Sequence, residues 1–260
     1  MSAINAIVTT TAAHMLVDGL CYHNGEVTKV DSEKAYVLRG MRAAVAATGD
    51  AKTAYFFQAA IEQEFTKFED VVAAGSEFFV QGFKAFANRF CSGNAVSNVV
   101  LIGWLEMENR PAAFGIDLVE GAGNWASSRR SSGDPIGILA ELPIIAVPPP
   151  SLDEIMAANY PLGSAGDPVG PEEKILHLME VQRRIPADDG KFYVGGQAML
   201  TTITAQGVTQ RVIRQWPEDK PGELVRPAEI DWAAWREKRA TAGMSRLKRK
   251  MLLKKMKKAA

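Results

Sequence analysis

The chain has 260 residues and a mass of 28.2 kDa, a length that suits one large domain or two small ones. Hydrophobic residues make up 47% and charged residues 23% of the sequence, which excludes a disordered, collagen-like or coiled-coil chain. No apolar run reaches about 18 residues, so no membrane-spanning helix is predicted. The N-terminus has no basic region and no small-residue cleavage site after a hydrophobic core, so we predict no signal peptide. The two cysteines, Cys21 and Cys91, suit a reducing compartment, and we predict a cytoplasmic or particle-assembled location.

The formal net charge of zero conceals a strong asymmetry between the C-terminus and the rest of the chain. Residues 236–258 contain 11 Lys and Arg and one Glu, a net charge of +10, whereas the rest carries 19 basic and 29 acidic residues, a net charge of −10. The sequence therefore predicts a cationic arm on an acidic body.

Extended structure is predicted first along the chain, from residue 4 to residue 48. β-Branched and apolar residues favour strands here, and the Asn24-Gly25 pair is typical of a tight hairpin turn. The expected strands cover residues 4–13, 14–22, 35–38 and 43–47. Between Tyr55 and Phe90 apolar residues recur at spacings of three and four, which predicts two helices packed face to face.

Strand patterns return after residue 98, and a second helical pair follows them. Strands are expected over residues 99–105, 112–118 and 136–147, the last ending in Pro148-Pro149-Pro150. Helices are expected over residues 152–159 and 171–185, and closing strands over residues 192–204 and 208–215.

This order predicts the fold class and the domain organisation. Two amphipathic helix pairs inserted between groups of strands must cover sheet faces, which predicts an α+β fold with four layers, helix/sheet/sheet/helix. We assign residues 1–216 to this domain, residues 217–228 to a Pro/Gly-rich linker, and residues 229–260 to a basic amphipathic C-terminal helix.

Several features of the first fifty residues occur together in one known family. Asp18-Gly19 ends the second strand, Lys34 precedes the third, and Ala-Ala-Val-Ala-Ala-Thr-Gly-Asp at 43–50 turns into the first helix. With the element order over residues 2–216, these features resemble the proteasome β-subunit family and its bacterial and phage relatives, which have the N-terminal nucleophile (Ntn) hydrolase fold.

The resemblance implies a particular active site. In an Ntn hydrolase the mature chain begins with Thr, Ser or Cys, and its free α-amine is the base for its own side chain. The family spacing, counted back from Asp18 and Lys34, places the nucleophile at Ser2, on condition that Met1 is removed. Asp18 would orient the site, and Lys34 would lower the pKa of the amine and favour the developing negative charge.

Two observations favour an inactive relative instead. The family usually has a Gly-Ser-Gly-like turn after the strand that corresponds to 136–147, whereas this chain has Val147-Pro148-Pro149-Pro150-Ser151. Asp18 and Lys34 also have a plain interpretation as a buried ion pair, and the family includes members that keep the fold only to assemble.

Other candidate sites are weaker. His14, His23 and His177 lie in separate elements without ligand spacing, so we expect no metal site and no cofactor. The Thr9–Thr11 run is interpreted as mid-strand rather than as a processing site, and Cys21 as a packing residue. Gly121-Ala122-Gly123 lacks the context of a phosphate loop, and Gly163-Ser164-Ala165-Gly166 comes too late to replace the missing turn.

The C-terminal arm is the strongest local signal in the sequence. Its apolar stripe includes Met244, Leu247 and Met251, and the opposite faces are basic. Three binding interpretations compete for such a helix: an acidic protein surface, nucleic acid phosphates or an anionic membrane. The alternative is a solvated, frayed tail that binds nothing. The residues expected to bind a partner are Arg246, Leu247, Lys248, Arg249, Lys250, Met251, Lys254, Lys255, Lys257 and Lys258.

Three functional hypotheses follow from these patterns. The first is a catalytically inactive assembly protein with a proteasome-like fold, built through the arm into an oligomer or a phage-type particle as a virion or tail component. The second is an N-terminal serine amidohydrolase or peptidase that uses Ser2. The third is a nucleic-acid-associated protein, which depends on the arm alone.

Overall fold

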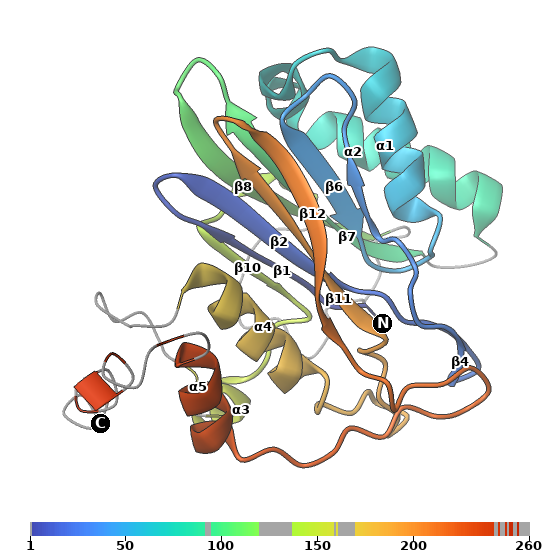
Figure 1. Ribbon diagram of the computed structural model, residues 1–260. Helices are drawn as coiled ribbons and strands as arrows, with labels where there is room; N and C mark the ends of the chain where they lie inside the picture. Colours follow the sequence, from blue (N-terminus) through green and yellow to red (C-terminus); the bar gives the residue numbers. More distant parts are fainter. Residues whose placement is uncertain are drawn as a thin grey trace.

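In the computed structural model, the chain forms a mixed α+β fold with antiparallel sheets (Figure 1). The structure describes residues 2–91, 95–119, 137–158, 160, 170–241, 244, 248, 250, 251 and 254. Two groups of strands are each followed by a pair of helices, and a strand pair and a helix complete the chain. The element order predicted from the sequence is confirmed.

The first sheet contains both the N-terminal strands and the last strand pair. Its strands are β10 (Ile144–Val147), β1 (Ile4–Val8), β2 (Ala12–Asp18), β11 (Gln197–Thr204) and β12 (Gly207–Gln215), in this spatial order. The Thr9–Thr11 run, predicted to lie within a strand, is instead the turn between β1 and β2, where Thr9 Oγ1 accepts a hydrogen bond of 3.0 Å from the Ala12 amide. This threonine hydroxyl closes the turn, a common role for the residue type.

The second sheet contains the middle strands of the chain. Its strands are β5 (Ala35–Val37), β6 (Ala43–Ala47), β7 (Val96–Leu105), β8 (Arg110–Val119) and β9 (Ala140–Glu141), in this spatial order. The single strand predicted over residues 136–147 is wrong, because β9 pairs with β8 and β10 with β1, in different sheets. Pro143, which has no amide hydrogen to donate, lies between these two strands.

A short hairpin, β3 (Cys21–His23) and β4 (Glu26–Lys29), leaves the end of β2. Asn24 and Gly25 between its strands have φ values of 53° and 88°, as a two-residue hairpin turn requires. The predicted tight turn is therefore confirmed.

Helices pack against the outer faces of the two larger sheets. Helices α1 (Thr53–Glu64) and α2 (Phe68–Phe90, interrupted at Gly75) pack on the second sheet, and α4 (Pro171–Gln182) packs on the first (Figure 1). Ring centroids of Phe57 and Phe79 lie 5.5 Å apart, so the predicted face-to-face helix pair is confirmed. The remaining helices are α3 (Leu152–Ala157) and α5 (Trp232–Ala240).

The segment after β12 packs against the body of the molecule. Trp216, Asp219 and Val225 are buried, and the buried Arg183 of the α4 C-terminus donates hydrogen bonds of 2.8 and 2.7 Å to the Asp219 carboxylate. The linker predicted over residues 217–228 is thus fixed at this point by an ion pair.

The C-terminal helix differs in extent from the expected one. It begins at Trp232, whose ring stacks on that of the buried His177 with centroids 4.9 Å apart. Met244 is not helical, whereas residues 248, 250, 251 and 254 are.

Candidate active site

The three residues predicted to be catalytic lie together at one end of the two larger sheets. Ser2 precedes β1, Asp18 ends β2, and Lys34 precedes β5. The Lys34 Nζ atom lies 3.0 Å from Ser2 Oγ and 3.0 Å from Asp18 Oδ2. One ammonium group therefore contacts both the hydroxyl and the carboxylate.

Asp18 fixes the geometry of this cluster. Its Oδ1 atom accepts a hydrogen bond of 2.8 Å from the Ala3 amide, and the Asp18 amide donates one of 3.2 Å to the Ala3 carbonyl. Its Oδ2 atom also accepts from the Leu20 amide at 3.2 Å. Because Ala3 follows Ser2 directly, the carboxylate holds the beginning of β1 in place and orients Lys34.

Burial makes the ion pair energetically sensitive. Asp18 is 0% and Lys34 9% exposed, so both groups have lost most of their hydration. Such a loss is compensated only when geometry is good and further hydrogen bonds satisfy the charges. The amides of Ala3 and Leu20 and the Ser2 hydroxyl supply those bonds.

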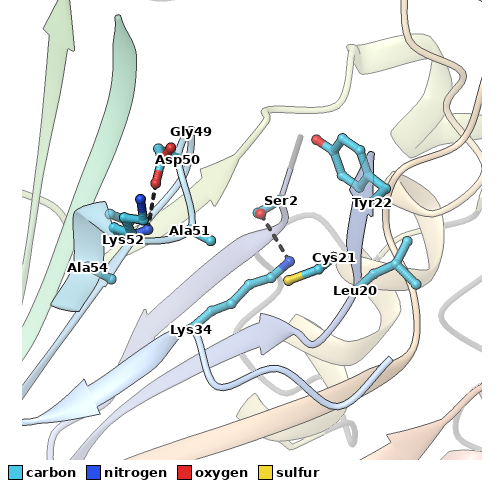
Figure 2. A pocket seen from close by; sticks show the side chains of 11 residues that line it. Ser2, Leu20, Cys21, Tyr22, Lys34, Gly49, Asp50, Ala51, Lys52 and Ala54 are labelled. Carbon is cyan, nitrogen blue, oxygen red and sulfur yellow. Dashed lines mark hydrogen bonds between the residues drawn. The ribbon is translucent and has the colours of Figure 1, made fainter. Parts of the chain in front are cut away.

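The cluster faces a pocket of about 370 Å³, within the size range of small-molecule sites. Figure 2 shows Leu20 and Tyr22 on one side of Ser2, and the segment from Gly49 to Lys52 on the other. The lining residues are Ser2, Leu20, Cys21, Tyr22, Lys34, Ala47, Gly49, Asp50, Ala51, Lys52 and Ala54.

Gly49 allows the chain to turn tightly at this wall, between β6 and α1. Its φ is 91°, and a Cβ atom built there would lie 2.5 Å from the Val96 carbonyl oxygen. A larger residue would be strained both in its backbone and by this contact. The glycine therefore brings the backbone of residues 49–52 to the pocket opposite Ser2.

The pocket walls were not predicted as part of the site. Cys21 was interpreted as a packing residue, yet it is half-buried, lines the pocket and donates a hydrogen bond of 3.0 Å to Ser32 Oγ. The Thr48-Gly49-Asp50 turn was noted only as part of the resemblance. Its glycine before a helix is the one sequence signal that pointed to this wall.

The Gly-Ser-Gly-like turn expected of the family has no counterpart in the part of the chain that the structure describes. Ser151 caps α3 instead, with its hydroxyl accepting from the Glu154 amide at 3.2 Å. Among the described residues that line the pocket, Ser2 is the only serine or threonine. Gly163–Gly166 and Gly121–Gly123 lie outside the described residues.

Other predicted site features fall elsewhere. Within the described ranges no group of three or more His, Cys, Asp or Glu side chains could hold a metal ion. The same residues include no helix that is long and apolar enough to cross a membrane. In the arm, Lys248, Lys250, Met251 and Lys254 are exposed. Its other predicted partner-binding residues lie outside the described part: Arg246, Leu247, Arg249, Lys255, Lys257 and Lys258.

Comparison with protein-family models and with curated proteins found no match to this chain.

Proposed function

We propose that this chain is an amide hydrolase of the Ntn type, with Ser2 as the nucleophile once the bond between Met1 and Ser2 has been cleaved. The observation that carries the proposal is the position of Lys34 Nζ, 3.0 Å from Ser2 Oγ, beside a pocket. The packing of α1 and α2 on one sheet and α4 on the other is compatible with the four-layer sandwich of that class.

The chemistry would begin at the N-terminus. The free α-amine of Ser2 takes the proton from Ser2 Oγ while the oxygen attacks the substrate carbonyl carbon, forming the C–O bond. Lys34 donates a hydrogen bond to Oγ and stabilises negative charge that develops there. The C–N bond then breaks, and the leaving amine takes the proton from the ammonium of Ser2. Water hydrolyses the resulting ester.

Two further features support this scheme. Asp18 keeps Lys34 oriented at the hydroxyl and, through the Ala3 amide, holds Ser2 in place. The backbone N–H groups of residues 49–51 are candidates for binding the oxyanion, since this part of the wall lies across the pocket from Ser2.

The test begins with the intact mass of the purified protein, which reports whether Met1 is present. Protein that begins at Ser2 is then treated with a sulfonyl fluoride, which sulfonylates activated hydroxyl groups. We expect modification of Ser2, located by peptide mass spectrometry, and hydrolysis within a panel of aminoacyl p-nitroanilides. Ser2→Ala should abolish both, and Ser2→Thr should retain both.

Thr10→Ala is the matched control, because it removes an exposed hydroxyl from the β1–β2 turn. It should leave sulfonylation and hydrolysis unchanged. Equal hydrolysis by the Ser2→Ala protein would overturn the proposal, as would an unreactive Ser2 in protein that lacks Met1.

A second candidate function, assembly through the arm, is favoured by the opposite charges of the arm and the body, +10 and −10. Among the described basic residues of the arm, Lys238, Lys248, Lys250 and Lys254 are exposed. They are therefore accessible to an acidic surface on another copy. Assembly and hydrolysis are compatible, because none of the arm residues that the structure describes lines the pocket.

A further inference from the structure

We propose that Tyr22 determines the specificity of the pocket, which would take an aromatic side chain of the substrate next to the scissile amide. Tyr193 and Asp189 would act as positioning residues for Tyr22. That the bound molecule is a substrate rests on the proposed hydrolase function. The preference of the pocket for an aromatic side chain can be tested without catalysis.

The charged groups of the pocket wall already have partners. Lys34 contacts Asp18, and Lys52 Nζ lies 5.5 Å from the centre of the Phe90 ring. The Asp50 carboxylate accepts a hydrogen bond of 2.8 Å from the Lys52 amide. Asp50 and Lys52 give this wall one charge of each sign, so it favours neither an acidic nor a basic substrate side chain, while Leu20, Ala47 and Ala54 provide apolar contacts.

Tyr22 is the only aromatic side chain among the described lining residues. In Figure 2 it stands beside Ser2, across the pocket from Asp50. Aromatic rings gain affinity for one another in offset or edge-to-face contact. A substrate ring in the pocket would thus contact Tyr22 while its carbonyl group reaches Ser2.

The position of Tyr22 is fixed by a segment far away in the sequence. Its ring centroid lies 4.3 Å from that of Tyr193, whose hydroxyl donates a hydrogen bond to the Asp189 carboxylate. This bond raises the pKa of Tyr193 to about 12, so the hydroxyl remains a donor even at moderately alkaline pH. Lys191 Nζ also donates a bond of 3.1 Å to the Asn24 carbonyl at the hairpin tip.

The hairpin that carries Tyr22 is thus held at its tip by Lys191 and at the Tyr22 ring by Tyr193. Neither residue lines the pocket, so an effect of Tyr193 on binding would have to act through Tyr22. This is the property that separates a positioning residue from a residue in contact with substrate.

Cys21 provides a readout of pocket occupancy, because it lines the pocket and is half-buried. Its rate of alkylation by iodoacetamide is measured in the Ser2→Ala protein, which cannot turn over substrate. The added probes are the N-acetyl amides of phenylalanine, alanine, lysine and aspartate at matched concentrations. Alkylation of Cys91, outside the pocket, is the internal control.

We expect the phenylalanine amide to protect Cys21 about tenfold better than the alanine amide, the factor that one aromatic contact supplies. The lysine and aspartate amides should protect no better than the alanine amide. Tyr22→Leu should abolish the aromatic preference, and Tyr22→Phe, which keeps the ring, should retain it.

Tyr193→Phe tests the positioning role, since it removes the bond to Asp189 and keeps the ring. It should reduce the ratio of phenylalanine to alanine protection. Tyr36→Phe, which removes a hydroxyl bonded to the Glu33 carbonyl outside the pocket, should not change that ratio. A purely structural role of Tyr193 would lower the melting temperature without changing the ratio.

Equal protection by the phenylalanine and alanine amides would overturn the inference, as would a preference for a charged amide or an aromatic preference that survives Tyr22→Leu. If Tyr22→Leu does not fold, the ratio measured in Tyr193→Phe decides. Failure of the hydrolase proposal would appear separately, as an unreactive Ser2 in a protein whose Cys21 is still protected.

Discussion

At the residue scale, Asp18 and Lys34 are at once a candidate catalytic pair and a buried ion pair. Both are engaged in hydrogen bonds that join the beginning of β1, the end of β2 and the chain before β5. The two roles make different predictions for substitution, because stability responds to an unpaired buried charge, whereas catalysis responds to the position of the ammonium group.

Asp18→Asn should separate these roles. It leaves the charge of Lys34 buried without compensation, which lowers the free energy of unfolding by about 3–5 kcal/mol. The double variant Asp18→Asn/Lys34→Met removes the second charge as well and should recover most of that loss, while remaining inactive. Urea unfolding followed by circular dichroism measures the free energy of unfolding of the single and the double variant. A double variant as unstable as Asp18→Asn would contradict this account of the pair.

His14 gives the stability of the protein a dependence on pH. Burial has the largest effect and lowers the pKa of His14. The charge of Glu172 raises this pKa, and the charge of Arg211 lowers it. Its Nδ1 atom lies 3.1 Å from Thr202 Oγ1. The folded state therefore resists protonation more than the unfolded state does, and stability is lost as the pH falls below the unfolded value of about 6.5.

We expect His14→Gln to reduce the loss of stability between about pH 7 and pH 5. Glutamine does not titrate, so the contribution of the His14 imidazole to the pH dependence of the free energy of unfolding is removed. Unfolding free energies of the two proteins, measured at several pH values, give the difference directly. His23→Gln, at an exposed position on β3, is the control and should follow the parent chain. A His14→Gln curve parallel to that of the parent chain would show that His14 does not contribute.

At the element scale, the helices cover the second sheet through close contacts that tolerate no added volume. A Cβ atom at Gly103 of β7 would lie 2.2 Å from the Phe68 ring at the start of α2. At Gly115 of β8, the neighbouring strand, the nearest side-chain atom would lie 3.6 Å away, an ordinary contact. Two glycines on paired strands thus differ sharply in their surroundings.

Gly103→Ala should therefore lower the free energy of unfolding by about 1–3 kcal/mol, the usual effect of overpacking. Gly115→Ala should be neutral or slightly stabilising, since alanine has less conformational freedom in the unfolded chain. Thermal unfolding of the two variants side by side measures the difference in their melting temperatures. Equal melting temperatures would show that Phe68 can move away from β7 at little cost.

Local patterns predicted the elements well where a single period or turn motif dominates. The Asn24-Gly25 turn and the Phe-rich helix pair were predicted because their signals lie within a few residues. The division of residues 136–147 between two sheets was not predicted, since an apolar run does not show which strand it pairs with. Only β8 and β1, distant in sequence, determine that choice.

The candidate site was also predictable only in part: its three polar residues were predicted, and its pocket walls were not. Ser2, Asp18 and Lys34 followed from the resemblance and the spacing it implies, and the structure brings them together. The walls of the pocket were missed because segments 20–22 and 47–54 carry no chemical motif and meet only when the sheets are formed. Tyr193 was missed for the same reason, since it is 171 residues beyond Tyr22 in the sequence.

At the scale of the whole molecule, the arm and the body have opposite charges of equal size. Helix α5 is fixed to the body by the contacts of Trp232 and Trp235 with His177, whose ring centroids lie 4.9 and 4.8 Å away. Thr241, which follows α5, is buried. A chain truncated after residue 241 therefore keeps these contacts and loses eight basic residues.

We expect the full chain to associate at low ionic strength and the chain truncated after residue 241 to remain monomeric. The association should weaken as salt is added, because screening shortens the range of charge attraction from about 10 Å at 0.1 M to about 3 Å at 1 M. Sedimentation velocity at several salt concentrations measures both effects. A full-length chain with Lys248, Lys250 and Lys254 replaced by glutamine is the matched control, and its association should be intermediate because it keeps the arm but loses part of its charge. An oligomer that is unchanged by truncation would show that copies meet through another surface, and a monomeric full chain would leave the arm without a role in self-association.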